Sequence, residues 1–233
     1  MGHECRFSKI YQKNINRNSV KSDEYKFIEK VKIVCIGRNY TAHINELQNE
    51  KPKHPVLFLK PDTTILQKNQ PFFIPHFTDD IHYEVEVLVK IEKLGKHIEP
   101  QFAHKYYSQI GLGIDFTART VQKELKENGL PWEKAKAFDG STLIGEWYDK
   151  SRFDSLEKLS FSLEKNGEEV QLGNTENMLW KIDELISYCS QYFTLKIGDV
   201  LFTGTPSGVG PVALEDQLVG YLEGQQAFSV KIK

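Results

Sequence analysis

The sequence contains only three cysteines, and none of them belongs to a metal-binding or redox motif. Cys5, Cys35 and Cys189 lie far apart, without a CxxC pair or a Cys/His cluster that would bind zinc. An odd number of scattered cysteines is typical of a reducing compartment. No apolar run approaches the roughly 18 residues of a membrane span, and the N-terminus lacks the apolar core of a signal peptide. We therefore expect a cytoplasmic protein.

The sequence also lacks an excess of charge of either sign. Its 30 lysines and arginines nearly balance 32 aspartates and glutamates, which gives a formal net charge of -2. Such a balance provides no basic surplus to drive binding to nucleic acid or to an anionic membrane. Aromatic residues make up 12% of the chain, so enough core material is present to exclude disorder outside the ends. We expect neither nucleic acid nor a membrane as a partner.

The chain divides into a polar leader and one domain. Residues 1–30 interleave asparagine with lysine and arginine and show little apolar periodicity, so we expect them to be loosely packed. Residues 31–37 have a strand pattern, Val-Lys-Ile-Val-Cys-Ile-Gly, and open a single domain that reaches residue 233. Strand patterns outnumber helix patterns and do not alternate with them as βαβ units. This order predicts an α+β fold built on a mixed, mainly antiparallel β architecture.

Local patterns predict several individual elements. Two alternating runs joined by Asn-Gly predict a hairpin over residues 159–172. Amphipathic spacing predicts the longest helix over residues 176–193 and a shorter helix over residues 119–128. Asn39 is placed to cap a short helix that carries His43.

A strand pattern over residues 82–91 contains two carboxylates. Side chains alternate between faces along a strand, so Glu84 and Glu86 share a face and lie roughly 7 Å apart. If that face is inside the protein, two unpaired charges cost several kcal/mol each, and a divalent cation between them removes this cost. The alternative is an edge strand with both acids in solvent, and this segment alone leaves the two interpretations open.

Asp115 ends an otherwise apolar strand pattern. A third carboxylate at this point would complete an all-oxygen set with Glu84 and Glu86. Hard oxygen ligands suit Mg²⁺ or Mn²⁺ better than zinc, and three of them leave coordination positions for water and a chelating substrate. The alternative role of Asp115 is the N-cap of the helix predicted over residues 119–128.

Three further features are candidates for a role in catalysis or substrate binding. His43 and Glu46 lie three residues apart on the short helix, where a carboxylate raises the basicity of an imidazole and makes a candidate general base. Surface pairs with this spacing are also common without any function. Lys136, between small and aromatic residues, is a candidate anion ligand, although most lysines are in solvent. The loop over residues 203–211 offers N–H groups and hydroxyls to a carboxylate, but it lacks the Gly-Lys-Ser/Thr ending of a P-loop.

Short motifs of this kind follow one another along the whole domain. They are Gly37-Arg-Asn-Tyr40, His43 with Glu46, Phe58-Leu-Lys60-Pro61, His82-Tyr-Glu84-Val-Glu86, Gly113-Ile-Asp115-Phe-Thr-Ala-Arg119, Gly129-Leu-Pro-Trp132, Ala135-Lys136-Ala-Phe138 and Gly198-Asp-Val-Leu-Phe-Thr-Gly-Thr205-Pro. Together they resemble the fumarylacetoacetate hydrolase family, and in particular its small single-domain branch of acylpyruvases and oxaloacetate decarboxylases. The leader has no counterpart in this resemblance.

The resemblance implies a fold, a metal site and an assembly. The fold is a mixed β-sandwich roll with a few peripheral helices, the ion is Mg²⁺ with Mn²⁺ as the alternative, and the assembly is a homodimer. In the family a lysine contacts the developing enolate or the substrate carboxylate, and the His/Glu pair lies on a lid. The matching residues here are Glu84, Glu86 and Asp115 for the metal, His43, Glu46 and Lys136 for catalysis, and Arg38, Gln122 and Thr205 for substrate binding.

The leading functional hypothesis is a Mg²⁺-dependent hydrolase that cleaves a C–C bond of small acylpyruvates through a metal-bound pyruvate enolate. His43, oriented by Glu46, would draw a proton from water, and oxaloacetate decarboxylation is a further activity that the same site would support. One alternative is an isomerase of the 2-hydroxyhepta-2,4-diene-1,7-dioate type on the same scaffold. Another is a non-catalytic protein that binds 2-oxo acids. The metal centre is common to these reactions, so the lid and the distal part of the pocket decide among them.

Overall fold

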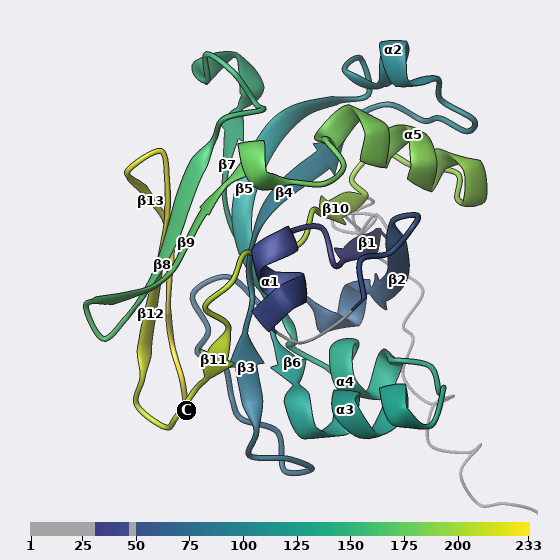
Figure 1. The fold of residues 1–233 in the computed structure, drawn as a ribbon. Helices are drawn as coiled ribbons and strands as arrows, with labels where there is room; N and C mark the ends of the chain where they lie inside the picture. The colour runs from purple at the N-terminus through teal and green to yellow at the C-terminus, as the bar shows by residue number, and fades with distance from the viewer. Residues whose placement is uncertain (1–30, 47–49) are drawn as a thin grey trace, which may run out of the picture. The chain divides into compact units, whose positions relative to one another are not determined.

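The computed structural model describes residues 31–46 and 50–233, and the leader predicted over residues 1–30 lies outside this range. The largest sheet pairs neighbouring strands in antiparallel fashion, except for one parallel pair formed by its second and third strands (Figure 1). In spatial order its six strands are β2 (Val56–Pro61), β1 (Lys32–Gly37), β10 (Val200–Phe202), β4 (Val85–Ile91), β5 (Tyr107–Asp115) and β7 (Thr142–Asp149).

Two smaller antiparallel sheets accompany the large one. The four-stranded sheet has the order β13 (Gln225–Lys231), β12 (Gln217–Leu222), β8 (Ser160–Lys165) and β9 (Glu168–Asn174). The three-stranded sheet has the order β11 (Gly210–Pro211), β3 (Ile81–Tyr83) and β6 (Thr117–Ala118). The prediction of a mixed, mainly antiparallel β architecture is therefore confirmed.

Helices are few and short in the described residues. They are α1 (Thr41–Glu46), α2 (Pro100–Ala103), α3 (Arg119–Glu127), α4 (Glu133–Lys136) and α5 (Ile182–Tyr192). Figure 1 shows the α3 and α4 pair at the opposite end of the domain from the α2 and α5 pair. In the part of the chain that the structure describes, no helix has the length and apolar character needed to span a bilayer.

The central strand β4 is buried on both faces. Its valines belong to the main hydrophobic core, which also contains residues of the four-stranded sheet. On the opposite face, Leu88 packs into a second apolar cluster. Glu84 and Glu86 alternate with the valines and therefore lie on the same side as Leu88, where they are 5% and 3% exposed. The two acids are thus inside the protein, which excludes the edge-strand interpretation.

The predicted hairpin has a clear structural basis, and so does one close approach between strands. The hairpin predicted over residues 159–172 is formed by β8 and β9, and its turn residues Asn166 and Gly167 have φ values of 56° and 84°. These left-handed conformations are those that an Asn-Gly hairpin turn requires. In β5, a Cβ atom on Gly113 would lie 2.2 Å from the carbonyl oxygen of Leu143, so glycine permits the close approach of β7.

The helix predicted over residues 176–193 begins later, at Ile182. The preceding stretch contains a 3₁₀ turn, Thr175–Asn177, and an isolated bridge between Met178 and Tyr40. Its backbone thus pairs with the segment before α1 instead of continuing the helical hydrogen bonds. Met178 has the spacing of a helical apolar face, which is why the predicted helix included this stretch. It is buried beside the Tyr40 bridge and is not part of the helix.

Two further expectations need correction. The side chain of Asn39 does not cap α1; its Oδ1 accepts from the N–H of Trp180 (2.9 Å), and its Nδ2 donates to the carbonyl oxygen of Thr203 (2.8 Å). The strand predicted over residues 82–91 is interrupted at Glu84, which lies between β3 and β4. The interruption matters because β3 leaves the large sheet and pairs with β6 and β11.

Candidate active site

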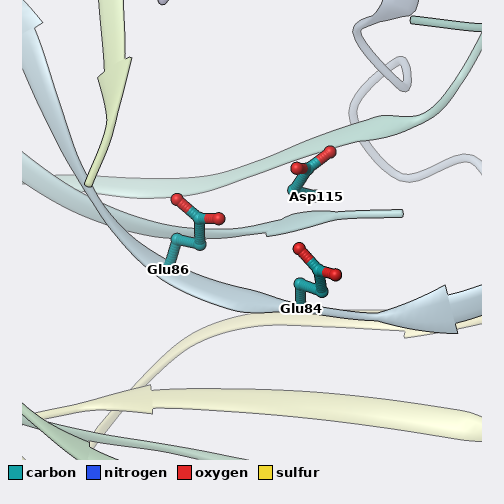
Figure 2. Close-up of side chains that lie close together, drawn as sticks. All are labelled: Glu84, Glu86 and Asp115. Carbon is teal, nitrogen blue, oxygen red and sulfur yellow. The ribbon is translucent and has the colours of Figure 1, made fainter. Parts of the chain in front are cut away.

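Three buried carboxylates converge at one point of the large sheet. Figure 2 shows Glu84, Glu86 and Asp115 with their carboxylates pointing toward one another. One oxygen from each residue lies within 4.8 Å of the others. Asp115 ends β5, and its N–H donates to the carbonyl oxygen of Glu84 (2.9 Å). The N-cap of α3 is Ala118, so Asp115 does not have the capping role that was its alternative.

Two buried lysines hold the carboxylates from different sides. The Nζ of Lys136 lies 2.6 Å from Glu84 Oε2 and 2.7 Å from Asp115 Oδ2. The Nζ of Lys60 lies 2.6 Å from Asp115 Oδ1 and donates to the carbonyl oxygen of Ser141 (2.9 Å). Both oxygens of Asp115 thus face a cation. Lys60 was not among the predicted site residues; its signal in the sequence is a lysine at the end of an apolar strand, which needs a buried acid as partner.

Lys136 is held in its charged form. Burial alone would lower the pKa of Lys136, but Asp115 and Glu84 outweigh this effect and raise the pKa above its ordinary value. Thr117 also accepts a hydrogen bond from its Nζ (2.6 Å). A lysine in this state is an electrostatic group and a hydrogen-bond donor, not a base.

Glu84, like Asp115, has a cation in contact with each of its oxygens. Its Oε1 accepts from Arg119 (2.5 Å), and Oε2 accepts from Lys136. Burial would raise the pKa of Glu84, but these two cations hold it far below the ordinary range. Glu84 therefore stays ionised. Arg119 also donates to Gln122 Oε1 (2.7 Å), so the first turn of α3 is tied to the triad.

Glu86 is the least compensated. Among the described residues, its carboxylate accepts one hydrogen bond, from the N–H of Gly204 (2.6 Å). Burial and the neighbouring Asp115 and Glu84 raise the pKa of Glu86 well above its ordinary value. Gly204 has a φ of 101°, and a Cβ there would lie 2.8 Å from the Cβ of Asn39, so this donor position requires glycine.

A divalent cation fits this arrangement of charges. The donors are all carboxylate oxygens, they are buried, and Glu86 has no cationic partner among the described residues. A hard ion between them would replace like-charge repulsion by attraction, and oxygen-only sites are preferred by Mg²⁺ and Mn²⁺. Glu84, Glu86 and Asp115 are therefore the residues of this structure that would hold such an ion.

The predicted histidine–glutamate pair is formed. His43 Nδ1 lies 3.1 Å from Glu46 Oε2, and the other oxygen of Glu46 accepts from the N–H of Gly208 (2.9 Å). Glu46 thus connects α1 to the loop that follows β10. Burial lowers the pKa of His43, although Glu84 and Glu46 oppose this effect. The imidazole is therefore neutral at neutral pH and has a ring nitrogen that accepts a proton.

One pocket brings most of the predicted site residues together. Eight of the nine line it, and the ninth, Glu46, contacts His43. The lining residues from the prediction are Arg38, His43, Glu84, Glu86, Asp115, Gln122, Lys136 and Thr205. The other side chains of the lining had no predicted role; they are Ile36, Phe58, Arg119, Lys126 and Trp132.

Gln171, on β9, supports this pocket from outside. Its Nε2 donates to Thr205 Oγ1 (2.9 Å) and its Oε1 accepts from the N–H of Val85 (3.0 Å). The side chain is 1% exposed and links the loop after β10 to the start of β4. Sequence patterns contain no signal for this contact, because Gln171 is 86 residues from Val85 in the chain.

Comparison with known proteins identifies the fold. Residues 32–232 match the family described as fumarylacetoacetate (FAA) hydrolase, C-terminal. The chain belongs to the fumarylacetoacetate hydrolase family. Oxaloacetate tautomerase YcgM of Escherichia coli is 41% identical over 194 residues, which cover 83% of this chain and 89% of that protein. The mitochondrial oxaloacetate tautomerase FAHD1 of Bos taurus is 38% identical over 201 residues, covering 86% and 91%.

A solved member of the family contains a metal ion. The structure of fumarylpyruvate hydrolase from Pseudomonas aeruginosa, in complex with Mn²⁺ and pyruvate, superposes with a TM-score of 0.81 and 33% identity. It covers 86% of this chain and 88% of its own. The chain therefore has the fold of the fumarylacetoacetate hydrolase family, and the relatives to which it is similar are named as enzymes. Two of these relatives are named for oxaloacetate tautomerisation, a reaction that the motifs did not predict, and the bovine one is mitochondrial, so a cytoplasmic location stays a prediction.

Proposed function

We propose that this protein is a divalent-metal-dependent enzyme that interconverts the keto and enol forms of a small 2-oxo acid of the oxaloacetate type. One observation carries the proposal: the same pocket contains three converging carboxylates, a charged lysine and a neutral histidine. The names of the two relatives support this reaction over the C–C cleavage that the motifs suggested.

A divalent ion at the acidic triad would supply the electrostatic part of the chemistry. Held by Glu84, Glu86 and Asp115, Mg²⁺ or Mn²⁺ would attract the carboxylate and the 2-oxo group of the substrate and favour negative charge on the 2-oxo oxygen. Lys136 adds a second positive charge that is fixed in place before the reaction by Glu84 and Asp115. We propose Lys136 as the residue that stabilises the enolate.

His43 is the group of this pocket suited to moving the proton. In the keto-to-enol direction its neutral imidazole takes a proton from C3, the C–H electron pair becomes the C2–C3 double bond, and the 2-oxo oxygen gains the negative charge. A proton on that oxygen completes the enol, and the reverse direction uses the same groups. Glu46 holds the ring in one orientation and stabilises the imidazolium that forms.

Hydrolysis of acylpyruvates is the second candidate, because the same dyad would activate water. Two aromatic side chains of the pocket, Phe58 and Trp132, pack with ring centroids 5.8 Å apart and offer an apolar wall to an acyl group. In this reaction hydroxide adds to the distal carbonyl, the C–C bond breaks and pyruvate leaves as its enolate. Oxaloacetate decarboxylation shares that enolate, with CO₂ as the leaving group.

The reactions are separated by their products. Oxaloacetate in its enol form is mixed with the protein and Mg²⁺ or Mn²⁺, the loss of enol absorbance is followed, and pyruvate is assayed in the same samples. We expect enol loss faster than in buffer, without pyruvate. Pyruvate release from acetylpyruvate without any effect on enol oxaloacetate would favour the hydrolase, and isomer formation from an unsaturated dioate would favour the isomerase. Inertness toward every 2-oxo acid would favour the non-catalytic binder.

The pH dependence tests the role of His43. Because the pKa of His43 lies below its usual 6.5, the neutral form is retained to lower pH. We expect kcat/KM for the keto-to-enol direction to rise with pH, with an inflection below 6.5, and to be level at neutral pH. Glu46 raises the pKa of His43, so Glu46→Gln should move the inflection to still lower pH. An inflection above 6.5, or one that Glu46→Gln leaves in place, contradicts this assignment.

A further inference from the structure

Lys60 is a charged side chain beside the acidic triad that the proposed reaction does not use. It is fully buried and, unlike Lys136, it does not line the pocket. Its Nζ lies 2.6 Å from Asp115 Oδ1. A buried ammonium group is destabilising unless a buried acid compensates it, so the contact between Lys60 and Asp115 is a strong constraint on both side chains.

The head of Lys60 is fixed in a closed circuit of hydrogen bonds. Besides contacting Asp115, it donates to the carbonyl oxygen of Ser141 (2.9 Å). Ser141 Oγ in turn donates to the carbonyl oxygen of Lys136 (2.9 Å), and Lys136 Nζ lies 2.7 Å from Asp115 Oδ2. The circuit thus returns through Asp115 to Lys60. All four residues are at most 3% exposed, so solvent water competes little for these contacts.

The two oxygens of Asp115 have different surroundings. Oδ2 contacts Lys136, which lines the pocket, whereas Oδ1 contacts Lys60, which does not. A carboxylate oxygen has two lone pairs, so Oδ2 is able to accept from Lys136 and still bind an ion. An ion that also bound Oδ1 would lie close to the ammonium group of Lys60, where burial leaves the repulsion between the two positive charges poorly screened.

We propose that Lys60 is a positioning residue that restricts Asp115 to a single ligand oxygen and thereby biases the acidic triad toward small octahedral ions such as Mg²⁺ over Ca²⁺. Mg²⁺ demands near-ideal octahedral geometry, whereas Ca²⁺ takes about six to eight oxygens and accepts both oxygens of a carboxylate. The inference deepens the proposed function and rests on it for the presence of an ion at the triad. A single ligand oxygen from Asp115 also leaves more of the ion open to a chelating 2-oxo acid.

Lys60→Met tests this role through the ratio of two affinities. The dissociation constants of Mg²⁺ and Ca²⁺ are measured by competition with Mn²⁺, without turnover. Both ions carry two positive charges, so the effect of removing the lysine charge cancels in their ratio, and a change in the ratio reports on coordination. We expect the affinity for Mg²⁺ relative to that for Ca²⁺ to fall about tenfold or more, because partners behind metal ligands have effects of this size.

Lys68→Met is the matched control for Lys60→Met. Lys68 is exposed and pairs with Glu146 (2.7 Å), which is exposed as well, and neither residue lines the pocket. An exposed pair of this kind contributes little, so the same substitution there should leave the ratio of the two affinities unchanged. Melting curves with and without Ca²⁺ show whether each variant is folded.

A crystal structure of the Mn²⁺-loaded, unaltered protein tests the same point without a substitution. We expect Asp115 to bind the ion through Oδ2 alone, with Oδ1 still in contact with Lys60. Ligation through both oxygens overturns the proposal, and so does a ratio of affinities that a folded Lys60→Met protein leaves unchanged. If Lys60→Met does not fold, the ligation of Mn²⁺ by Asp115 in this crystal structure decides.

Failure of this proposal and failure of the proposed reaction look different. Mg²⁺-dependent tautomerisation of oxaloacetate together with an unchanged ratio refutes only the role of Lys60. A ratio that falls in Lys60→Met, in a protein that does not accelerate tautomerisation, supports the role of Lys60 and refutes the proposed reaction.

Discussion

Glu86→Gln is expected to abolish metal-dependent turnover while leaving the protein folded. Loss of hydrogen-bond partners behind metal ligands typically costs 10- to 100-fold in metal affinity, so loss of a proposed ligand charge should cost more than about a hundredfold. Glutamine has the shape of glutamate, and its amide oxygen is able to keep the hydrogen bond from Gly204. The change therefore removes charge and little else. Metal affinity is measured by titration with Mn²⁺, and turnover by the enol assay.

The same variant makes a second, less intuitive prediction about stability. In the metal-free protein Glu86 is buried beside Glu84 and Asp115, and its raised pKa reflects that burial and this repulsion. Removing the charge relieves the repulsion, so the melting temperature of metal-free Glu86→Gln should equal or exceed that of the unaltered protein. Added Mn²⁺ should raise the melting temperature of the unaltered protein and not that of the variant.

Glu92→Gln is the control for this experiment. Glu92 follows β4 directly and is exposed, so the same substitution there should change neither metal affinity nor turnover. A Glu86→Gln protein that binds Mn²⁺ as tightly as the unaltered one would remove Glu86 from the metal site. A large drop in the stability of the metal-free variant would show that Glu86 has a structural role instead.

The two glutamates of the acidic triad were predictable because their determinants are local. Strand alternation places Glu84 and Glu86 on one face, and the apolar residues around them indicate burial. Asp115 joins them because β4 and β5 are antiparallel neighbours, with Glu86 opposite Gly113. Sequence alone does not fix that register, so Asp115 kept its alternative as a helix cap until the strand pairing was known. Its place in a family motif was the other reason to include it.

The support around the triad was not predictable from local patterns. Lys60 and Gln171 reach the site from strands that are distant in the chain, and each is fully buried only because of its tertiary partners. The late start of α5 has the same origin, since Met178 pairs with Tyr40 across more than half of the chain. Propensity and periodicity describe a segment by itself, and they fail where a distant partner satisfies its backbone.

The reaction was harder to predict than the site, for a chemical reason. Keto–enol conversion, decarboxylation and C–C hydrolysis of 2-oxo acids all pass through an enolate at C3. The triad and Lys136 serve that common species, so they do not distinguish one reaction from another. Discrimination depends on the rest of the pocket lining, where Phe58 and Trp132 would suit an acyl group. Motif resemblance gives little information about such side chains.

His43→Gln is expected to lower kcat for keto–enol conversion by about a hundredfold to ten-thousandfold, which is the usual contribution of a general base. Glutamine is of similar size and polar but does not accept a proton. His43 is not among the converging carboxylates, so the affinity for Mn²⁺ should stay within a few-fold of the unaltered value. This combination of lost turnover and retained metal distinguishes His43→Gln from Glu86→Gln. His76→Gln, at an exposed histidine, is the matched control.

The effect on each reaction then tells which role the dyad has. If His43 moves a proton to and from C3, His43→Gln should slow tautomerisation of oxaloacetate, and Glu46→Gln should slow it less, because Glu46 orients the base without contacting substrate. If the dyad serves only to activate water, tautomerisation should survive in both variants, and any release of pyruvate from acylpyruvates should be lost. An unchanged tautomerisation rate in His43→Gln would assign proton transfer at C3 to another group. The charged state of Lys136 makes that residue unsuitable as the replacement, so solvent water would then be the expected base.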